Sequence, residues 1–481
     1  MNTVQKIAKN SLVLLASNII SKILSFFYVM YIARYLGAEG FGILSFALAF
    51  TGIFGVFSDL GLSTLTVREV ARDKSLAGKY LGNITVIKIF LVIITFGLIA
   101  ITIKLLGYPT QTIKVVYFLA LSVIFSSFSN IFNSIFQAYE KMEYQSIEQI
   151  LSSTLMLVGA LFAISQGFSV VGFASIYFMV SAISLGYSFV VCVWKFTKPK
   201  IEVDWNFWKP TIKEALPFGL IGIFVTIYFW IDSVMLSLMK GNEVVGWYSM
   251  AYRLIVIIGS INASFFSAIF PATSKYYKTS RESLIIAYKK SFKYLSIVGL
   301  PIAMGTTLLA NRIIMLIYGS EYGPSITALR ILIWAGMFLF LTPLFGTILA
   351  SIDRQDLGLR TTGVCALANV LMNLLLIPKF SYIGASVATV VTEAIGFILQ
   401  YYFISKHLYQ IQLHKYIAIP LVATLAMSYV IFELKQLNLF VLVLIAITVY
   451  LTILHELRAF PKEDVDLLTN ILKSLRKEKQ R

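Results

Sequence analysis

Seven ionisable side chains lie inside long apolar stretches of this chain, and they are its candidates for binding chemistry. They are Lys22, Asp59, Lys88, Asp232, Arg253, Arg330 and Glu393. A charge at the centre of a bilayer costs at least about 2.5–3.5 kcal/mol, so such residues usually face a cavity or a partner of opposite charge. Four of the seven are basic and three are acidic. A cavity lined by them would be mildly cationic, which suits an anionic ligand better than a cationic one.

Five of these residues fall at two depths, where opposite charges recur. At 1.5 Å per helical residue, Asp232, Arg253 and Arg330 lie about 10 Å below the outer surface of the membrane. Asp59 and Lys88 lie at a similar depth below the inner surface. Two interpretations therefore stay open. The pairs Asp59–Lys88 and Asp232–Arg253 neutralise each other between packed helices, or these side chains line a substrate path.

Lys22 and Glu393 lie near the middle of the membrane, one in each half of the chain. If both face a central cavity, Lys22 could hold a phosphate group and could pair with Glu393 when the site is empty. The alternative is that Lys22 extends its charged head toward the membrane surface or donates to a backbone carbonyl.

The elements that position these residues are apolar segments long enough to cross a bilayer. A hydrocarbon core about 30 Å thick needs roughly 20 helical residues, and 58% of this chain is hydrophobic. In lipid such segments must be helices, since a helix satisfies its own backbone groups. We predict an all-α polytopic membrane protein with fourteen spans: 11–33, 42–65, 81–106, 113–137, 148–165, 169–194, 214–239, 246–271, 291–310, 324–350, 360–378, 383–405, 415–433 and 436–454.

The distribution of basic residues predicts the orientation. If the N-terminus is cytoplasmic, the inner segments hold most of the 40 Lys and Arg residues, as the positive-inside rule requires. We therefore expect a multi-pass protein of the cell membrane with both termini in the cytoplasm. The same pattern explains the net charge of +17 through attraction to membrane lipids, so we do not expect nucleic acid as a partner.

Several chemistries find no support in the sequence. Cys192 and Cys365 both fall inside spans, and the three histidines have no companion ligands at metal-binding spacing, so we expect no metal site. The chain contains no phosphate-binding loop and no dinucleotide fingerprint, so we expect no cofactor. A membrane-embedded glycosyltransferase or polymerase would need a large loop or soluble domain with catalytic groups. We therefore expect a protein that is not an enzyme.

The chain also repeats itself. Three sequence matches recur at offsets of 206, 213 and 212: 40–42 with 246–248, 134–141 with 347–354, and 171–183 with 383–395. They predict two six-helix lobes, residues 1–205 and 206–412, in the same orientation, because each holds an even number of spans. Parallel repeats of this kind are a known architecture of membrane transporters, in which the substrate path lies where the two lobes meet. Residues 413–481 add two further helices and a basic tail.

Short motifs carry a resemblance to a known family. The run Ala33-Arg34-Tyr35-Leu36-Gly37-Ala38-Glu39-Gly40-Phe41-Gly42, followed by Asp59-Leu60-Gly61-Leu62 and Arg68-Glu69, resembles the amino-terminal signature of the polysaccharide transporter (Wzx-like) family. That family belongs to the multidrug/oligosaccharidyl-lipid/polysaccharide exporter superfamily. Segments 137–142, 349–355 and 384–386 are similar to later family blocks.

The resemblance implies a function. It implies a V-shaped pair of six-helix bundles that flips a polyprenyl-linked oligosaccharide from the cytoplasmic to the outer leaflet by alternating access, for cell-surface glycan synthesis. An ion-coupled multidrug exporter would share the fold, but it would prefer an acidic residue in the first span, where this chain has Lys22. A lipid II-type flippase also fits fourteen spans and a cationic cavity.

The C-terminal region yields two lesser expectations. Spans 415–433 and 436–454 are apolar nearly throughout, so we expect a lipid-facing scaffold, with a groove for the polyprenyl tail as the alternative. Residues 462–481 place apolar side chains on one helical face among basic residues, the pattern of a helix on the cytoplasmic membrane surface. Docking of a glycan-assembly enzyme is the alternative for this tail. We expect the protein to act as a monomer.

Overall fold

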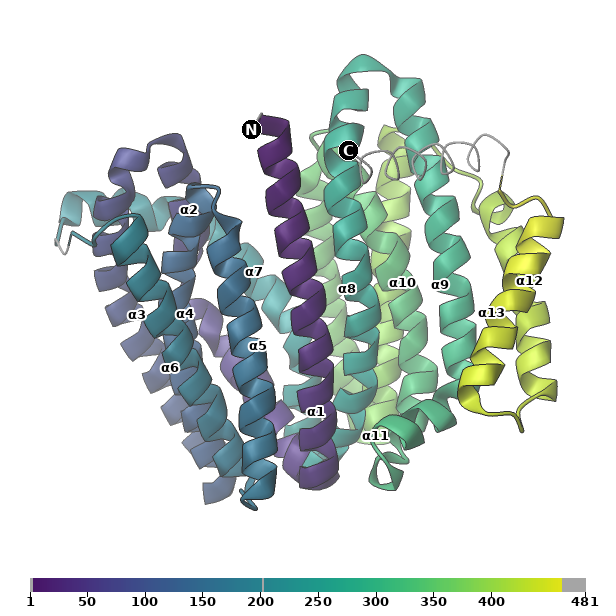
Figure 1. Ribbon diagram of the computed structural model, residues 1–481, viewed down its shortest axis with the longest axis horizontal. Helices are drawn as coiled ribbons and strands as arrows, with labels where there is room; N and C mark the ends of the chain where they lie inside the picture. The colour runs from purple at the N-terminus through teal and green to yellow at the C-terminus, as the bar shows by residue number, and fades with distance from the viewer. Residues whose placement is uncertain (1–2, 201–202, 461–481) are drawn as a thin grey trace, which may run out of the picture. The chain divides into compact units, whose positions relative to one another are not determined.

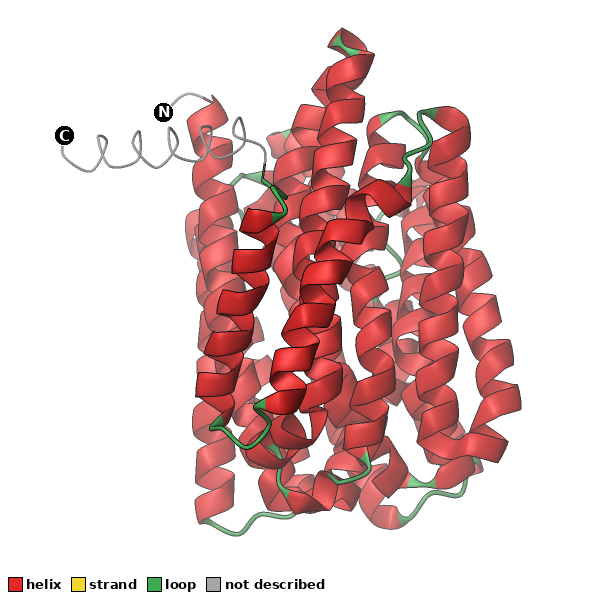
Figure 2. Cartoon of the chain, turned by 90° about the vertical axis from the view of Figure 1, so that its right-hand side faces the viewer, coloured by secondary structure: helices red, strands yellow, loops and turns green. Residues whose placement is uncertain are grey.

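The computed structural model describes residues 3–200 and 203–460 of the chain, and within these ranges every regular element is a helix (Figure 2). The predicted surface helix at 462–481 lies outside the described residues. Short 3-10 helices cover Val56–Ser58 (η1), Lys74–Leu76 (η2) and Ser320–Tyr322 (η3). The α-helices, coloured along the chain in Figure 1, are α1 (Thr3–Gly55), α2 (Leu62–Arg72), α3 (Ala77–Leu105), α4 (Thr110–Ala138), α5 (Met142–Ser165), α6 (Val170–Lys195), α7 (Trp205–Lys240), α8 (Asn242–Thr279), α9 (Arg281–Ile317), α10 (Ser325–Ser351), α11 (Gln355–His407), α12 (Leu413–Glu433) and α13 (Leu439–Glu456).

The predicted membrane spans are confirmed as helices. In the part of the chain that the structure describes, eleven helices are long and apolar enough to cross a membrane. Two of them, α1 and α11, each hold two predicted spans, which are separated by non-helical backbone at Gly37 and Ser381. Helix α8 covers the predicted span 246–271. The fold is therefore that of an all-α polytopic membrane protein.

The second predicted span, 42–65, ends earlier than its apolar composition suggested. Helix α1 stops at Gly55, and α2 begins only at Leu62. Between them Leu60 and Gly61 both adopt positive φ, 46° and 84°, a region that a continuous right-handed helix excludes. A Cβ on Gly61 would lie 2.5 Å from the carbonyl oxygen of Ala215 in α7. The break at 56–61 thus brings the backbone of the first two helices against α7.

Two helix ends repeat the same backbone motif. Glu140 after α4 and Asp353 after α10 have φ of 57° and 61°. In each, the next residue donates from its backbone N–H to a carbonyl five residues earlier, Lys141 to Phe136 at 2.9 Å and Arg354 to Leu349 at 2.8 Å. This is the Schellman arrangement that ends a helix with a left-handed residue. Both ends belong to one of the sequence matches, at the offset of 213.

The chain divides into two compact units. The first contains Met1–Arg253, Ile317–Ala328 and Thr362–Thr392, and the second contains Leu254–Leu316, Leu329–Thr361 and Glu393–Arg481. In the first unit α1 packs against α4, α5 and α7, and α4 packs against α6. Isoleucine and phenylalanine side chains on the outer face of α3, such as Ile93 and Ile101, are more than half exposed, as expected of a surface that meets lipid.

The second unit contains the two additional C-terminal helices. Helices α12 and α13 pack against each other (Figure 1) and onto α9, where the hydroxyl of Tyr450 donates to the carbonyl oxygen of Ile297 at 2.6 Å. Large apolar side chains remain exposed on both helices, among them Tyr429, Phe432, Phe440 and Leu444. This exposure supports the interpretation of α12 and α13 as a lipid-facing scaffold.

Candidate functional site

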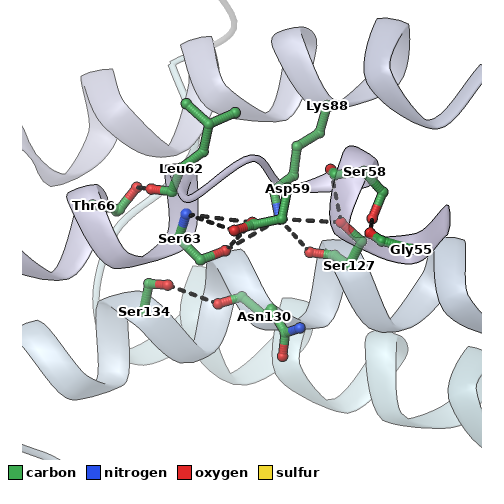
Figure 3. Close-up of polar contacts among 10 residues, drawn as sticks. All are labelled: Gly55, Ser58, Asp59, Leu62, Ser63, Thr66, Lys88, Ser127, Asn130 and Ser134. Atoms are coloured by element: carbon green, nitrogen blue, oxygen red, sulfur yellow. Dashed lines mark hydrogen bonds and ion pairs between the residues drawn. The ribbon is translucent and has the colours of Figure 1, made fainter. Parts of the chain in front are cut away.

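Asp59 and Lys88 form an ion pair in the first unit (Figure 3). Lys88 lies on α3 with a fully buried side chain, and its Nζ is 2.6 Å from Oδ1 of Asp59 in the break between η1 and α2. The Lys88 ammonium also donates to the carbonyl oxygen of Ser127 at 2.6 Å and to the hydroxyls of Ser127 and Ser63 at 3.2 Å. Because an ammonium has three donors, these contacts account for its charge without a substrate. Of the two interpretations that the sequence left open, the structure shows the ion pair for Asp59 and Lys88.

Asp232 on α7 does not pair with Arg253, so that prediction is wrong. The buried carboxylate accepts hydrogen bonds from three neutral donors, the Tyr248 hydroxyl at 2.6 Å, Nδ2 of Asn373 at 2.5 Å and the Thr389 hydroxyl at 2.9 Å. The reason lies in helix geometry. Tyr248 and Arg253 are five residues apart on α8, which places them about 140° apart around the helix axis. When Tyr248 faces Asp232, Arg253 points elsewhere.

The Asp232 cluster is rich in oxygen. Nδ2 of Asn373 lies 3.0 Å from Oδ1 of Asn369, and Oδ1 of Asn373 is buried without a hydrogen-bond partner. Carboxylate, amide and hydroxyl oxygens are ligands of hard cations, so the cluster could hold a proton or such a cation. Among the described residues, no group of three His, Cys, Asp or Glu side chains offers a metal site.

Arg253 lies instead among aromatic side chains. Its guanidinium is centred 5.3 Å from the ring of Phe41 on α1, and Tyr177 and Tyr318 lie in its vicinity. The side chain is half-buried, and no carboxylate in the described part of the chain forms an ion pair with it. An arginine that packs beside aromatic side chains and forms no ion pair leaves the N–H donors of its planar guanidinium available to an anion such as phosphate.

The remaining three predicted site residues are not among the residues of these clusters. Lys22 is exposed on α1, Arg330 is exposed on α10, and Glu393 is buried on α11. Lys22 belongs to the first unit and Glu393 to the second. The pairing of Lys22 with Glu393 stays a prediction.

The structure also contains a polar cleft that the sequence analysis missed. It has a volume of about 550 Å³ and lies among α1, α4 and α5. The residues that line it are Leu14, Asn18, Asn133, Gln137, Met142, Gln145, Glu148, Gln149, Ser152 and Ser153. A smaller cavity of about 250 Å³ extends it along α4, α5 and α6 and shares Glu148 and Ser152. Small-molecule sites typically enclose about 300–1,000 Å³.

A sequence signal for this cleft did exist. Gln145, Glu148, Gln149 and Ser152 recur at spacings of three and four residues, which places them on one face of a helix. Glu148, however, stands at the edge of its predicted span, 148–165, and not well inside it as the seven candidate residues do. Lys22 follows Asn18 by four residues, so it lies one turn along α1 on the face that lines the cleft.

Comparisons with known proteins find similarity over most of the chain. The model of a family described as polysaccharide biosynthesis protein matches residues 7–277, and the MatE family model matches 217–375. The probable low-salt glycan biosynthesis flippase Agl15 of Haloferax volcanii is 22% identical over 93% of this chain and 95% of its own length. The capsular polysaccharide biosynthesis protein CapF of Staphylococcus aureus is 24% identical over 83% of this chain and 99% of its own.

A solved structure has the same fold. The lipid II flippase MurJ in an inward closed conformation superimposes with a TM-score of 0.79, at 16% identity, over 93% of this chain and 99% of that one. The fold expected from the sequence is therefore that of solved membrane transporters.

Proposed function

We propose that this chain, which belongs to the polysaccharide biosynthesis protein family, flips a polyprenyl-(pyro)phosphate-linked oligosaccharide from the cytoplasmic to the outer leaflet by alternating access. Its relatives over nearly the full chain are named as glycan and capsular polysaccharide proteins. The observation that carries the proposal is the cleft of about 550 Å³ among α1, α4 and α5. Amides, hydroxyls and a carboxylate line it, although all three helices are long and apolar enough to cross a membrane. Such a lining costs free energy in lipid and is explained by a hydrophilic cargo.

The cargo would meet different groups along its length. Arg253 is the cation best prepared for phosphate, because it is half-buried and forms no ion pair in the described chain. Lys22 can add a mobile charge near the middle of α1. Lys88 and Asp59 neutralise each other, so their role is structural. The polyprenyl tail can stay in lipid, and the protein would act as a monomer.

Transport of this kind needs no ATP from the protein itself. A pyrophosphate with about two negative charges would gain roughly 4–5 kcal/mol when it moves outward across a membrane with an inside-negative potential of about 100 mV. A monophosphate would gain about half as much. The membrane potential could therefore drive export without a strictly coupled ion.

The moving parts in this proposal are the two six-helix lobes, 1–205 and 206–412, with 413–481 as an appended scaffold. Two observations support the duplication. The Schellman ends at Glu140 and Asp353 are alike, and Gly37 and Gly241 have φ of 68° and 90° with ψ of −178° and 172°. These glycines precede the helical segments that contain the sequence match between 40–42 and 246–248.

We predict that the linker after α6 is cytoplasmic and that the loop after α7 is outside. Single cysteines at the exposed positions Lys198 and Lys240 are introduced after replacement of Cys192 and Cys365. An impermeant thiol reagent on intact cells should label position 240 and spare 198, because basic residues concentrate on the cytoplasmic side. Labelling of 198 alone would reverse the orientation and, with it, the direction of transport.

We predict that Arg253→Gln lowers the flipping rate roughly 10- to 100-fold, since a hydrogen bond to a charged group contributes about 1.5–3 kcal/mol. The measurement is transport of a fluorescent polyprenyl diphosphate oligosaccharide in liposomes at matched protein amounts. Arg253→Lys should retain part of the rate, because it keeps the charge and loses the fork. The control is Lys104→Gln at the exposed end of α3, which should match wild type. Wild-type transport by Arg253→Gln would refute the phosphate role.

The same fold allows an ion-coupled exporter as a second candidate. The Asp232 oxygen cluster favours it, since it could hold a proton or cation. Coupling would appear as transport that depends on a sodium or proton gradient, and a lipid II-type flippase would appear as a preference for lipid II over other lipid-linked glycans in the same liposomes.

A further inference from the structure

The cleft among α1, α4 and α5 is built from hydrogen-bonding groups and lacks a positive charge among its lining residues. Its one charged group is Glu148 on α5, whose side chain is only 9% exposed. Oε2 of Glu148 accepts a hydrogen bond from Nδ2 of Asn133 at 2.5 Å. No Lys, Arg or His in the described part of the chain pairs with this carboxylate. A phosphate or an acidic sugar would meet repulsion here.

Amide pairs connect the walls of the cleft and leave further capacity free. Nε2 of Gln149 donates to Oδ1 of Asn18 at 2.7 Å, and Nε2 of Gln137 donates to Oε1 of Gln145 at 3.1 Å. An amide side chain offers two donor hydrogens and an acceptor with two lone pairs, so each pair uses only part of its hydrogen-bonding capacity. Several groups therefore remain for a ligand that carries both donors and acceptors.

Two buried polar atoms beside the cleft have no hydrogen-bond partner. They are Oδ1 of Asn133 and the hydroxyl oxygen of Ser129, and both residues line the cavities described above. A buried polar atom without a partner costs about 1–3 kcal/mol, so such atoms call for an explanation, and a bound ligand supplies one.

We propose that this cleft is a saccharide subsite, which binds uncharged hydroxyl-rich sugar units while Arg253 or Lys22 meets the phosphate. The inference rests on the proposed function and deepens it. Sugar hydroxyls both donate and accept, which matches amides and a carboxylate, whereas a polyprenyl tail would leave all these groups unpaired. The volume of about 550 Å³ lies in the usual range for small ligands. Neutral sugars are therefore favoured over uronic acids at this position.

Occupancy can be tested without relying on transport. Ser153 lines the cleft on α5, so Ser153→Cys in a background of Cys192→Ser and Cys365→Ser provides a near-isosteric thiol. A polyprenyl diphosphate with a neutral disaccharide should slow its alkylation at least fivefold, and the same lipid without sugar should not. The matched control is Gln166→Cys, just beyond the end of α5 and outside the cleft, which should be alkylated at equal rates with either lipid.

The outcomes separate the two proposals. If the disaccharide lipid is flipped in liposomes but protects Ser153→Cys no better than the bare lipid, the subsite is refuted and the flippase stands. If no lipid-linked glycan is flipped at all, the proposed function fails. As a second variant, Gln149→Leu should raise the apparent KM for the disaccharide lipid several-fold with an unchanged maximal rate, while Ser165→Ala at the end of the same helix should change neither. An unchanged KM in Gln149→Leu would also overturn the subsite.

Discussion

Replacing Asp59 with alanine should lower the free energy of unfolding by about 3–5 kcal/mol, because it leaves the charge of Lys88 buried without a counter-charge. Lys88 is fully buried, and within the described residues Asp59 supplies its one carboxylate contact, at 2.6 Å. The serine oxygens around Nζ are dipoles and do not replace a charge. The measurement is thermal and denaturant unfolding of the purified protein in detergent, followed by tryptophan fluorescence.

Two further variants separate the ion pair from general damage at this position. Asp59→Ala combined with Lys88→Met should recover most of the lost stability, since the double variant has no buried charge to compensate. Asp356→Ala removes the partner of Arg360 in a pair that is 3.8 Å long and exposed, so it should cost no more than about 1 kcal/mol. If Asp59→Ala and the double variant were equally unstable, the carboxylate would matter for the backbone break and not for Lys88.

Gly42→Ala should be the second severe change, with a loss of more than about 3 kcal/mol or no folded protein at all. A Cβ on Gly42 would lie 1.7 Å from the carbonyl oxygen of Asn242. The approach is reciprocal, since a Cβ on Gly246 would lie 2.0 Å from the carbonyl oxygen of Ala38. Both obstacles are backbone atoms, which cannot rotate away as a side chain can. Small residues that let helices meet this closely are a typical device of membrane proteins.

The chain offers a matched control for this change. Gly97 lies inside α3 and a Cβ there would meet nothing within 4 Å. Gly97→Ala should leave stability unchanged or raise it by up to about 1 kcal/mol, because alanine is the better helix former. Folded yield and melting temperature in detergent check both variants. Normal yield of Gly42→Ala together with wild-type stability would mean that α1 and α8 do not approach at these glycines.

The sequence by itself determined that the long apolar segments of this chain are helices. Lipid supplies no hydrogen bonds, so every long apolar segment has to satisfy its own backbone, and only a helix does this within one segment. The sequence also offered the Asp59–Lys88 ion pair as one of two open interpretations, and the structure shows that pair. Both residues lie in apolar segments at the same depth and carry opposite charges, and a charge inside a membrane usually has a partner of opposite sign. Both constraints depend on where a residue stands along the chain, and the sequence gives that position directly.

Only the tertiary structure decided which face of each helix meets which neighbour. Asp232 and Arg253 share a depth and carry opposite charges, yet Asp232 accepts from Tyr248, Asn373 and Thr389 instead. The rotation of α8 about its axis sets this outcome, because it decides whether Tyr248 or Arg253 faces Asp232. The cleft around Glu148 depends on tertiary structure in the same way, because serines and amides on separate helices form a polar site only when the faces of those helices converge.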